Sequence, residues 1–327
     1  MPPQFAANDA GGAVSVSTFL TSTRTWIRVV QCGTGNHSNP GLSEQTLGWL
    51  QAQVGGRVTV TGIRSLHDGE SPWWIDLRSP DDSLSAVVLR TPSRRIGPDQ
   101  LATNAAALAV AENYGLPAPR LLATDFDGRD AGVPVTLETV IAGMNRWPAK
   151  GSPGLLRSAG AVIAQVHCFA LAPRPHLPFR PRPIAVDDFA KERRLGRMST
   201  TTLLQLADER VQAISPPEGR AVFVHGDVWP GNTVLVGGRV HALTDWKTAG
   251  VGDPGVDLGE LRKQVAIFYG HDALTYVLEG WERASDAQAD DVPYWDAVAA
   301  LNTPTESYSP LAADRRDEFL SAAIAKL

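Results

Sequence analysis

The chain has 327 residues, of which 43% are hydrophobic and 20% charged, and its formal net charge is −5. This composition excludes a disordered chain, and a pI near 5.8 offers no basic surface for nucleic acid. No apolar run reaches the roughly 18 residues that a membrane-spanning helix needs. We therefore expect a globular protein of two domains or one large domain, with no nucleic-acid or membrane partner.

Cysteine use and charge distribution narrow this expectation. Cys32 and Cys168 are the only cysteines and lie far apart, which argues against a disulfide framework and against a paired-cysteine zinc site. Because the N-terminus also lacks a basic stretch followed by an apolar core, we expect a cytoplasmic location. Residues 271–327 carry a net charge of −7 and the preceding residues one of +2.

The first half of the chain is mostly predicted strand. A segment over 1–41 that is rich in small polar residues is interpreted as a poorly ordered extension, with one short strand near 26–30. A helix over 42–54 follows, with Ser43 as its possible cap. Alternating apolar residues, a loop over 67–72 and turn residues then predict an antiparallel meander and one main helix. The predicted strands are 58–66, 73–77, 84–90, 120–123 and 133–141, and the helix is 99–112.

The second half is mostly predicted helix, for example over 155–168 and 202–214. A strand-rich island at 221–244 interrupts it. Strands over 222–224, 233–236 and 240–244 flank polar clusters, and Gly237-Gly238 predicts a two-residue hairpin turn. The two halves together predict an α+β fold.

The polar clusters of the island carry the candidate chemistry. The hairpin brings Asp227, Asn232 and Asp245 to one end of the strands, and their oxygen atoms suit Mg²⁺ beside a polyphosphate rather than zinc. In phosphoryl transfer by kinases, an Asp takes the proton of the acceptor hydroxyl, an Asn five positions later binds metal, and a later Asp bridges metal and phosphates. Asp227 and Asn232 are separated by that five-residue step.

The stretch His225-Gly-Asp-Val-Trp-Pro-Gly-Asn232 resembles the catalytic loop of the aminoglycoside phosphotransferase and choline kinase superfamily, and Gly252-Asp253-Pro254 with Asp257-Leu258 continues the likeness. The resemblance implies that Asp227 is the catalytic base and that Asn232 and Asp245 bind the metal. It also implies a two-lobe, protein-kinase-like fold that uses ATP and Mg²⁺, with GTP left open.

This resemblance divides the chain into a nucleotide-binding lobe at 42–142 and a lobe at 143–327 that holds the catalytic loop and binds the acceptor. The acceptor would be a small molecule with a hydroxyl group, such as an aminoglycoside or another antibiotic, an amino alcohol or a sugar. Aminoglycosides are polycations, so we expect the acidic segment 271–327 to lie beside the acceptor site. The sequence does not determine the oligomeric state.

The first lobe should supply a positive charge for the phosphates, and Arg90 occupies the strand position where kinases carry a lysine. Arginine is permanently charged and can hold two phosphate oxygens at once. The family typically has a glutamate on the following helix, where this chain has Asn104. Asp99 or Glu112 could supply the missing carboxylate, or the site could work without one.

Four further residues are candidates for nucleotide binding. Gly69 and Ser71 lie in the loop where the family covers the phosphates, and Glu138 and Val140 lie where the hinge should bind adenine through its backbone.

Several residues near the motif are better explained by structural roles. His225 is interpreted as holding the loop, Asp253 as a helix cap, Asp257 as stabilising the helix start or the loop, and Trp246 as a core residue. Motifs of P-loop enzymes, serine hydrolases and zinc proteases are absent. The absent strand lysine and Asn104 leave one alternative open, a nucleotide-binding regulatory module with little catalysis.

Overall fold

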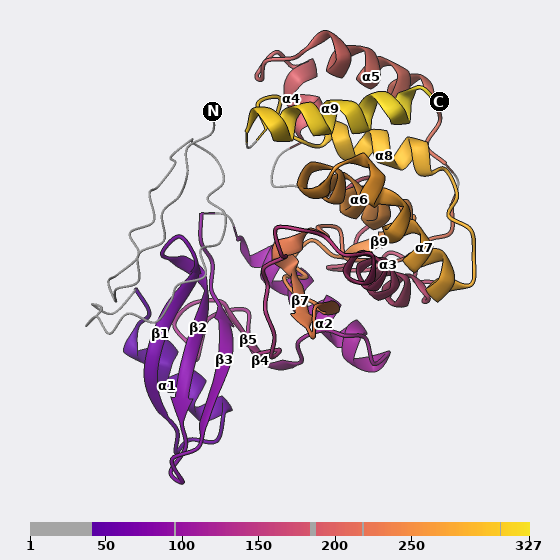
Figure 1. The fold of residues 1–327 in the computed structure, drawn as a ribbon. Helices are drawn as coiled ribbons and strands as arrows, with labels where there is room; N and C mark the ends of the chain where they lie inside the picture. Colours follow the sequence, from indigo (N-terminus) through magenta and orange to yellow (C-terminus); the bar gives the residue numbers. More distant parts are fainter. Residues whose placement is uncertain (1–40, 95, 184–187, 218, 308) are drawn as a thin grey trace, which may run out of the picture. The chain divides into compact units, whose positions relative to one another are not determined.

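The computed structural model describes residues 41–327 except 95, 184–187, 218 and 308 (Figure 1). The extension predicted over 1–41, apart from Gly41, and the strand expected near 26–30 lie outside the described residues. In the described part the elements follow the predicted order, a sheet first and helices afterwards.

The N-terminal part contains a five-stranded antiparallel sheet with the strand order β1-β2-β3-β5-β4. One face of this sheet packs against helix α1 (Glu44–Gln53), and alternate residues of each strand point to that face. Ile75, Leu89 and Leu137 of the strands and Leu50 of the helix are completely buried between them. The predicted cap is confirmed, since the Ser43 side chain accepts a hydrogen bond from the backbone N–H of Thr46. The strands are β1 (Thr59–His67), β2 (Glu70–Arg78), β3 (Leu84–Arg90), β4 (Leu121–Asp125) and β5 (Val135–Thr139).

The predicted loop over 67–72 is wrong. Strands β1 and β2 continue until His67 pairs with Glu70, so only Asp68 and Gly69 form the turn. Both have positive φ, 50° and 82°, which is the geometry of a tight hairpin turn. The polar and turn-forming residues over 67–72 suggested a longer loop, but residues 67 and 70–72 belong to the paired strands.

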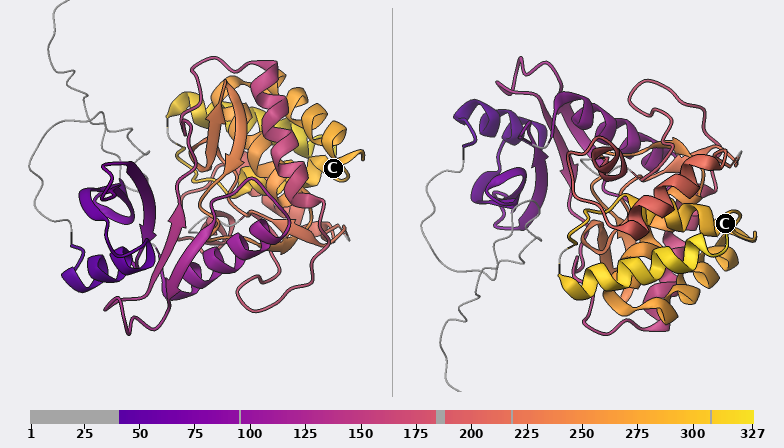
Figure 2. Two further views of the ribbon diagram at one scale, coloured as in Figure 1. Left: turned by 90° about the horizontal axis from the view of Figure 1, so that it is seen from below. Right: turned by 90° about the horizontal axis from the view of Figure 1, so that it is seen from above.

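Helix α2 (Pro98–Asn113) belongs to the N-terminal half of the sequence but shares the core of the C-terminal half. Its Leu108 and Ala111 are buried in the same apolar cluster as Val228 of the strand-rich island and the nearby Trp246. The helix therefore packs with the C-terminal half through its side chains. Figures 1 and 2 show its ribbon beside that half.

The C-terminal part is mostly helical, and two of its helices are in close contact through glycines. A Cβ atom at Gly160 would lie 2.1 Å from the carbonyl oxygen of Val277, and one at Gly280 would lie 2.1 Å from that of Arg157. The helices are α3 (Pro153–His167), α4 (Phe189–Arg194), α5 (Thr202–Ala213), α6 (Gly255–Tyr269), α7 (Leu274–Ser285), α8 (Val292–Leu301) and α9 (Pro310–Ile324), with short 3₁₀ turns η1 (Pro230–Asn232) and η2 (His271–Ala273).

Two small antiparallel sheets lie within this helical part. Strand β6 (Val222–Val224) pairs with β9 (Gly250–Gly252), and β7 (Thr233–Val236) pairs with β8 (Arg239–Leu243). The hairpin turn at Gly237-Gly238 is confirmed, with both residues at positive φ. Strand β9 is absent from the sequence prediction because its three residues are Gly-Val-Gly, which carry no strand signal.

The fold class is confirmed as α+β, with an antiparallel sheet in the N-terminal lobe and a helical C-terminal lobe. Among the described residues, none of the helices combines the length and the apolar character needed to span a lipid bilayer.

Candidate active site

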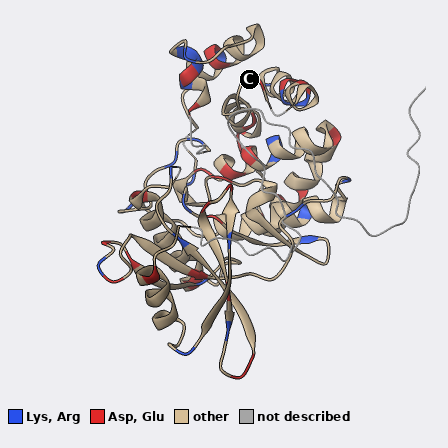
Figure 3. Cartoon of the chain, turned by 90° about the vertical axis from the view of Figure 1, so that its left-hand side faces the viewer, with Lys and Arg blue, Asp and Glu red and all other residues tan. Residues whose placement is uncertain are grey.

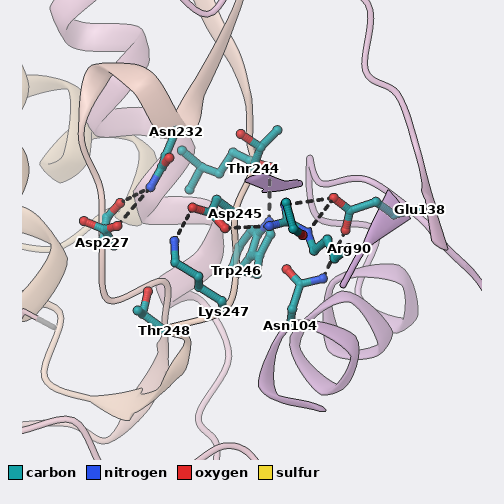
Figure 4. Close-up of polar contacts among 12 residues, drawn as sticks. Arg90, Asn104, Glu138, Asp227, Asn232, Thr244, Asp245, Trp246, Lys247 and Thr248 are labelled. Atoms are coloured by element: carbon teal, nitrogen blue, oxygen red, sulfur yellow. Dashed lines mark hydrogen bonds and ion pairs between the residues drawn. The ribbon is translucent and has the colours of Figure 1, made fainter. Parts of the chain in front are cut away.

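The loop between β6 and β7 carries two of the three predicted catalytic-centre residues. Strand β6 is fully buried, which anchors the start of the loop, and the 3₁₀ turn at Pro230 brings Asn232 back toward Asp227. The Asn232 side-chain amide donates to the backbone carbonyl of Asp227 at 2.9 Å and to its carboxylate at 3.2 Å (Figure 4). The five-residue spacing therefore places the two side chains together.

Asp245 follows β8 and completes the group. Its φ of 66° is a conformation that residues other than glycine rarely adopt, and such backbone strain is concentrated at functional sites. One carboxylate oxygen accepts a hydrogen bond from Arg90 Nη1 at 2.8 Å, and the other is in contact with the ammonium group of Lys247. A residue of strand β3 in the first lobe thus contacts a residue of the second (Figure 4).

The two cations determine the protonation of Asp245. Burial by itself would raise the pKa of this carboxyl, but Lys247 and Arg90 outweigh burial and hold its pKa well below the usual range. Asp245 is therefore ionised at neutral pH, as a metal ligand must be.

Arg90 has a second carboxylate partner that the sequence analysis missed. Its Nε and Nη2 atoms donate to Oε1 of Glu138 at 3.0 and 2.9 Å, and Asn104 donates to the other oxygen of Glu138 at 3.0 Å. All three side chains are buried. Burial would lower the pKa of Arg90, but Glu138 and Asp245 together raise it, so the guanidinium stays charged.

Neither Asp99 nor Glu112 supplies the carboxylate for Arg90. It comes from strand β5, next to β3 in the sheet, where Val88 pairs with Glu138. The neighbouring helix contributes an amide, Asn104, at the position where the family has a glutamate. Strand adjacency is the signal that could have identified Glu138, but it requires the strand order β3-β5, which the sequence does not reveal.

Asp257 of helix α6 holds the backbone at the start of the loop that carries Asp227. Its two oxygens accept hydrogen bonds from the backbone N–H groups of His225 and Gly226, both at 2.7 Å, and one also contacts Nε2 of His167 at 3.1 Å. Trp281 donates to the other ring nitrogen of His167, so Nε2 carries the proton and donates it to Asp257. Of the two interpretations of Asp257, stabilising the loop is the one observed.

His225 is a structural residue, as interpreted from the sequence. It is completely buried, and burial lowers its pKa, so the ring is neutral at pH 7. The backbone N–H of Asp227 donates to Nδ1, which leaves Nε2 to donate to the carbonyl of Thr244 at 3.0 Å. The neutral ring therefore connects the loop of Asp227 to the residue that precedes Asp245.

The remaining interpretations concern residues around this centre. Trp246 is fully buried, as interpreted from the sequence. The interpretation of Asp253 as the helix cap is wrong, because Pro254 is the N-cap of α6 and Asp253 accepts from the backbone N–H of Gly255 in the turn before the helix. Gly69 lies in the β1–β2 turn, Ser71 is buried with its hydroxyl accepting from the Thr91 N–H, and Val140 follows β5. Nucleotide contacts at Gly69, Ser71, Glu138 and Val140 stay predictions.

The donor atoms present fit a magnesium ion. Both amide hydrogens of Asn232 face Asp227, so its carbonyl oxygen is the atom offered to a cation, and the ionised Asp245 already attracts two cationic side chains. Over the described stretches no cluster of three or more His, Cys, Asp or Glu residues could hold a metal by itself. The donor set therefore suits an ion that completes its coordination with phosphate oxygens and water, as Mg²⁺ does.

Comparison with known proteins identifies the family to which the chain belongs. A sequence profile of the phosphotransferase enzyme family matches residues 63–301, which include Arg90, Glu138 and the whole catalytic loop. The chain belongs to the phosphotransferase enzyme family. No curated protein sequence matches it.

Solved structures share the fold over most of the chain. A candidate aminoglycoside phosphotransferase from Ralstonia eutropha is 17% identical, covers 86% of this chain and 96% of its own, and superposes with a TM-score of 0.59. A macrolide 2'-phosphotransferase from Brachybacterium faecium is 21% identical, with coverages of 85% and 98% and a TM-score of 0.53. Amicoumacin kinase, solved with AMP-PNP, Ca²⁺ and its antibiotic, is 12% identical, with coverages of 87% and 94% and a TM-score of 0.55.

Proposed function

We propose that the protein transfers the γ-phosphoryl group of ATP to a hydroxyl group of a small molecule, in the cytoplasm, where ATP is available. The observation that carries this proposal is the convergence of Asp227, Asn232 and Asp245 at one centre, with Arg90 reaching Asp245 from the other lobe (Figure 4). A base, two metal ligands and a phosphate-binding cation are the parts that phosphoryl transfer requires.

In this proposal residues 42–142 bind the nucleotide and residues 143–327 supply the catalytic loop and the acceptor site. The Asp68-Gly69 turn would approach the phosphates, and the segment after β5, beginning at Val140, would bind the adenine edge. The backbone of Glu138 pairs with β3 and β4 on its two sides, so its contribution would come through Arg90 instead. GTP uses the same phosphate contacts and remains open as a donor.

The reaction follows from the roles of these side chains. Asp227 accepts the proton of the acceptor hydroxyl while the hydroxyl oxygen forms a bond to the γ-phosphorus. The bond from the γ-phosphorus to the oxygen that bridges it to the β-phosphate breaks, which releases ADP. Arg90, held by Glu138 and Asp245, would orient the phosphates. Asn232 and Asp245 would hold Mg²⁺, which when bound neutralises phosphate charge.

The acceptor class is proposed from the relatives. The structures with the same fold include enzymes named for aminoglycosides, macrolides and amicoumacin, and one was solved with ADP and hygromycin B. We propose an antibiotic or a similarly hydroxylated small molecule as acceptor.

The test is the Asp227→Ala variant, assayed for ADP release with MgATP and a panel of hydroxylated acceptors. Loss of a general base lowers rates by about 10²- to 10⁴-fold, so we expect at least a hundredfold loss of transfer. Nucleotide affinity, measured by calorimetry, should stay within about twofold, and the variant Glu209→Ala, which removes an exposed acid of α5, should transfer normally. Undiminished turnover in Asp227→Ala would overturn the assignment.

The alternative, a regulatory module with little catalysis, was motivated by the absent lysine and by Asn104. The Glu138 carboxylate beside Arg90 removes much of that motivation, because the cation is held by an ion pair from a different element. ADP release with none of the acceptors, despite nucleotide binding, would favour the module.

A further inference from the structure

The catalytic centre contains a lysine that the kinase template does not assign. Lys247 lies two residues after Asp245, and its ammonium group contacts the Asp245 oxygen that Arg90 leaves free. The side chain is only 14% exposed. No lysine precedes Lys150 in the chain, so Lys247 adds an ammonium group to a centre whose β3 cation is Arg90.

The ammonium group of Lys247 lies where it would compete with a metal ion for Asp245. In protein kinases, two Mg²⁺ ions are held by the aspartate corresponding to Asp245 and by the catalytic-loop asparagine. Here Arg90 occupies one oxygen of Asp245 and Lys247 the other, and the carbonyl oxygen of Asn232 is the third protein donor. A second divalent ion close to the ammonium group would meet like charge at short range.

The charge of the centre supports a reduced metal requirement. Arg90 and Lys247 contribute two positive charges beside the carboxylates of Glu138 and Asp245. With Lys247 these four side chains are formally neutral together, and without it they would carry a net charge of −1. A protein cation therefore already supplies part of the charge that metal ions otherwise bring to the phosphates.

We propose that Lys247 takes the place of one of the two divalent ions, bonding the nucleotide phosphates directly, so that the nucleotide complex holds a single metal ion. This inference rests on the proposed function, because it requires that the site bind a nucleoside triphosphate. A primary ammonium group is a compact charge with three donors and suits this role, as the lysine of the P-loop does elsewhere.

The experiment counts metal ions. Wild type and Lys247→Met are saturated with AMP-PNP and titrated with Mn²⁺, and free Mn²⁺ is followed by electron paramagnetic resonance. We expect one ion per wild-type protein and a second ion in Lys247→Met. Lys247→Arg, which retains the charge, should bind one. Lys191→Met removes an exposed lysine of α4 and should behave as wild type.

A second readout uses no metal. With EDTA present, calorimetry should show that Lys247→Met binds ATP about tenfold more weakly than wild type, the size expected for one charge-assisted hydrogen bond. Thermal unfolding checks that the variant folds, and Lys247→Gln replaces it if the methionine variant does not.

Equal numbers of bound ions in wild type and Lys247→Met, or two ions in the wild type, would overturn this inference while nucleotide binding upheld the proposed function. Failure of the wild type to bind any nucleotide would overturn both.

Discussion

At the scale of single residues, the most informative group is the buried cluster of Arg90, Glu138 and Asn104. The carboxylate that holds Arg90 comes from strand β5, and the helix α2 offers an amide that hydrogen bonds to that carboxylate. Relative to the family pattern, the carboxylate lies on strand β5 and the helix carries an amide in place of the glutamate. The ion pair is therefore part of the sheet and does not depend on the placement of α2.

We expect Glu138→Gln to destabilise the protein by about 2 kcal/mol, because Arg90 then remains buried with Asp245 as its only carboxylate. Transfer should also slow, since Arg90 is held less firmly. Urea unfolding and initial rates measure the two effects. In the double variant Asn104→Asp/Glu138→Gln the carboxylate is restored on α2, and stability should recover in part. A double variant as unstable as the single one would contradict this role of the carboxylate.

A second residue-scale prediction concerns pH. Burial lowers the pKa of His225 in the folded protein, so the unfolded chain binds a proton first as the pH falls. The stability that the neutral ring contributes is complete above about pH 6.5 and declines below it. Asp257 and Asp245 stay ionised in this window, because their own pKa values are lowered.

The measurement is urea unfolding at pH 7.5 and 5.5. We expect His225→Gln to be less stable than wild type at pH 7.5 but to lose less stability on acidification. His241→Gln, at an exposed position of β8, is the matched control and should show the wild-type dependence. Parallel pH profiles for wild type and His225→Gln would disprove the assignment.

At the scale of elements, helices α3 and α7 are in close backbone contact through two glycines. Gly160 and Gly280 face backbone atoms of the partner helix, and neither backbone can move away cheaply, because each is part of a regular helix packed into the core.

Gly160→Ala should therefore destabilise the protein by about 2 kcal/mol or more through overpacking. Gly154→Ala, on the same helix, is the matched control, since its added methyl meets only the Ser152 hydroxyl at 4.0 Å. That control should be neutral or stabilising, because alanine favours the helix. Thermal unfolding of both variants checks the expectation, and equal melting temperatures would contradict it.

At the scale of the whole molecule, the acidity of residues 271–327 is not simply a surface for a polycation. Glu279 pairs with Arg157 and Asp296 with the buried Arg262, so part of the negative charge is balanced within the C-terminal lobe. Along the ribbon of the whole chain, Lys and Arg positions lie among Asp and Glu positions (Figure 3). The placement of this segment beside the acceptor stays a prediction.

Ligand-induced stabilisation tests this placement and the donor together. A ligand at a hundred times its Kd stabilises the folded state by about 2.7 kcal/mol, which should raise the melting temperature by several degrees. MgATP and MgGTP are compared first, and then aminoglycosides and macrolides with MgADP present. Stabilisation by macrolides but not by aminoglycosides would remove the electrostatic argument for a polycationic acceptor.

The sequence by itself determined the loop that brings Asp227 and Asn232 together, the two-residue hairpin and the strands of the N-terminal sheet. These depend on local signals: the spacing from Asp227 to Asn232, the turn at Gly237-Gly238, and the periodicity of apolar residues. Local signals survive folding when nothing in the tertiary structure opposes them.

The tertiary structure decided which charges meet. Glu138 is 48 residues from Arg90, and Asp245 is 155 residues away. The register of β3 against β5 creates the first contact, and the packing of one lobe against the other creates the second. Such contacts depend on strand order and lobe packing rather than on spacing along the chain, which is why the partners of Arg90 emerged only from the fold.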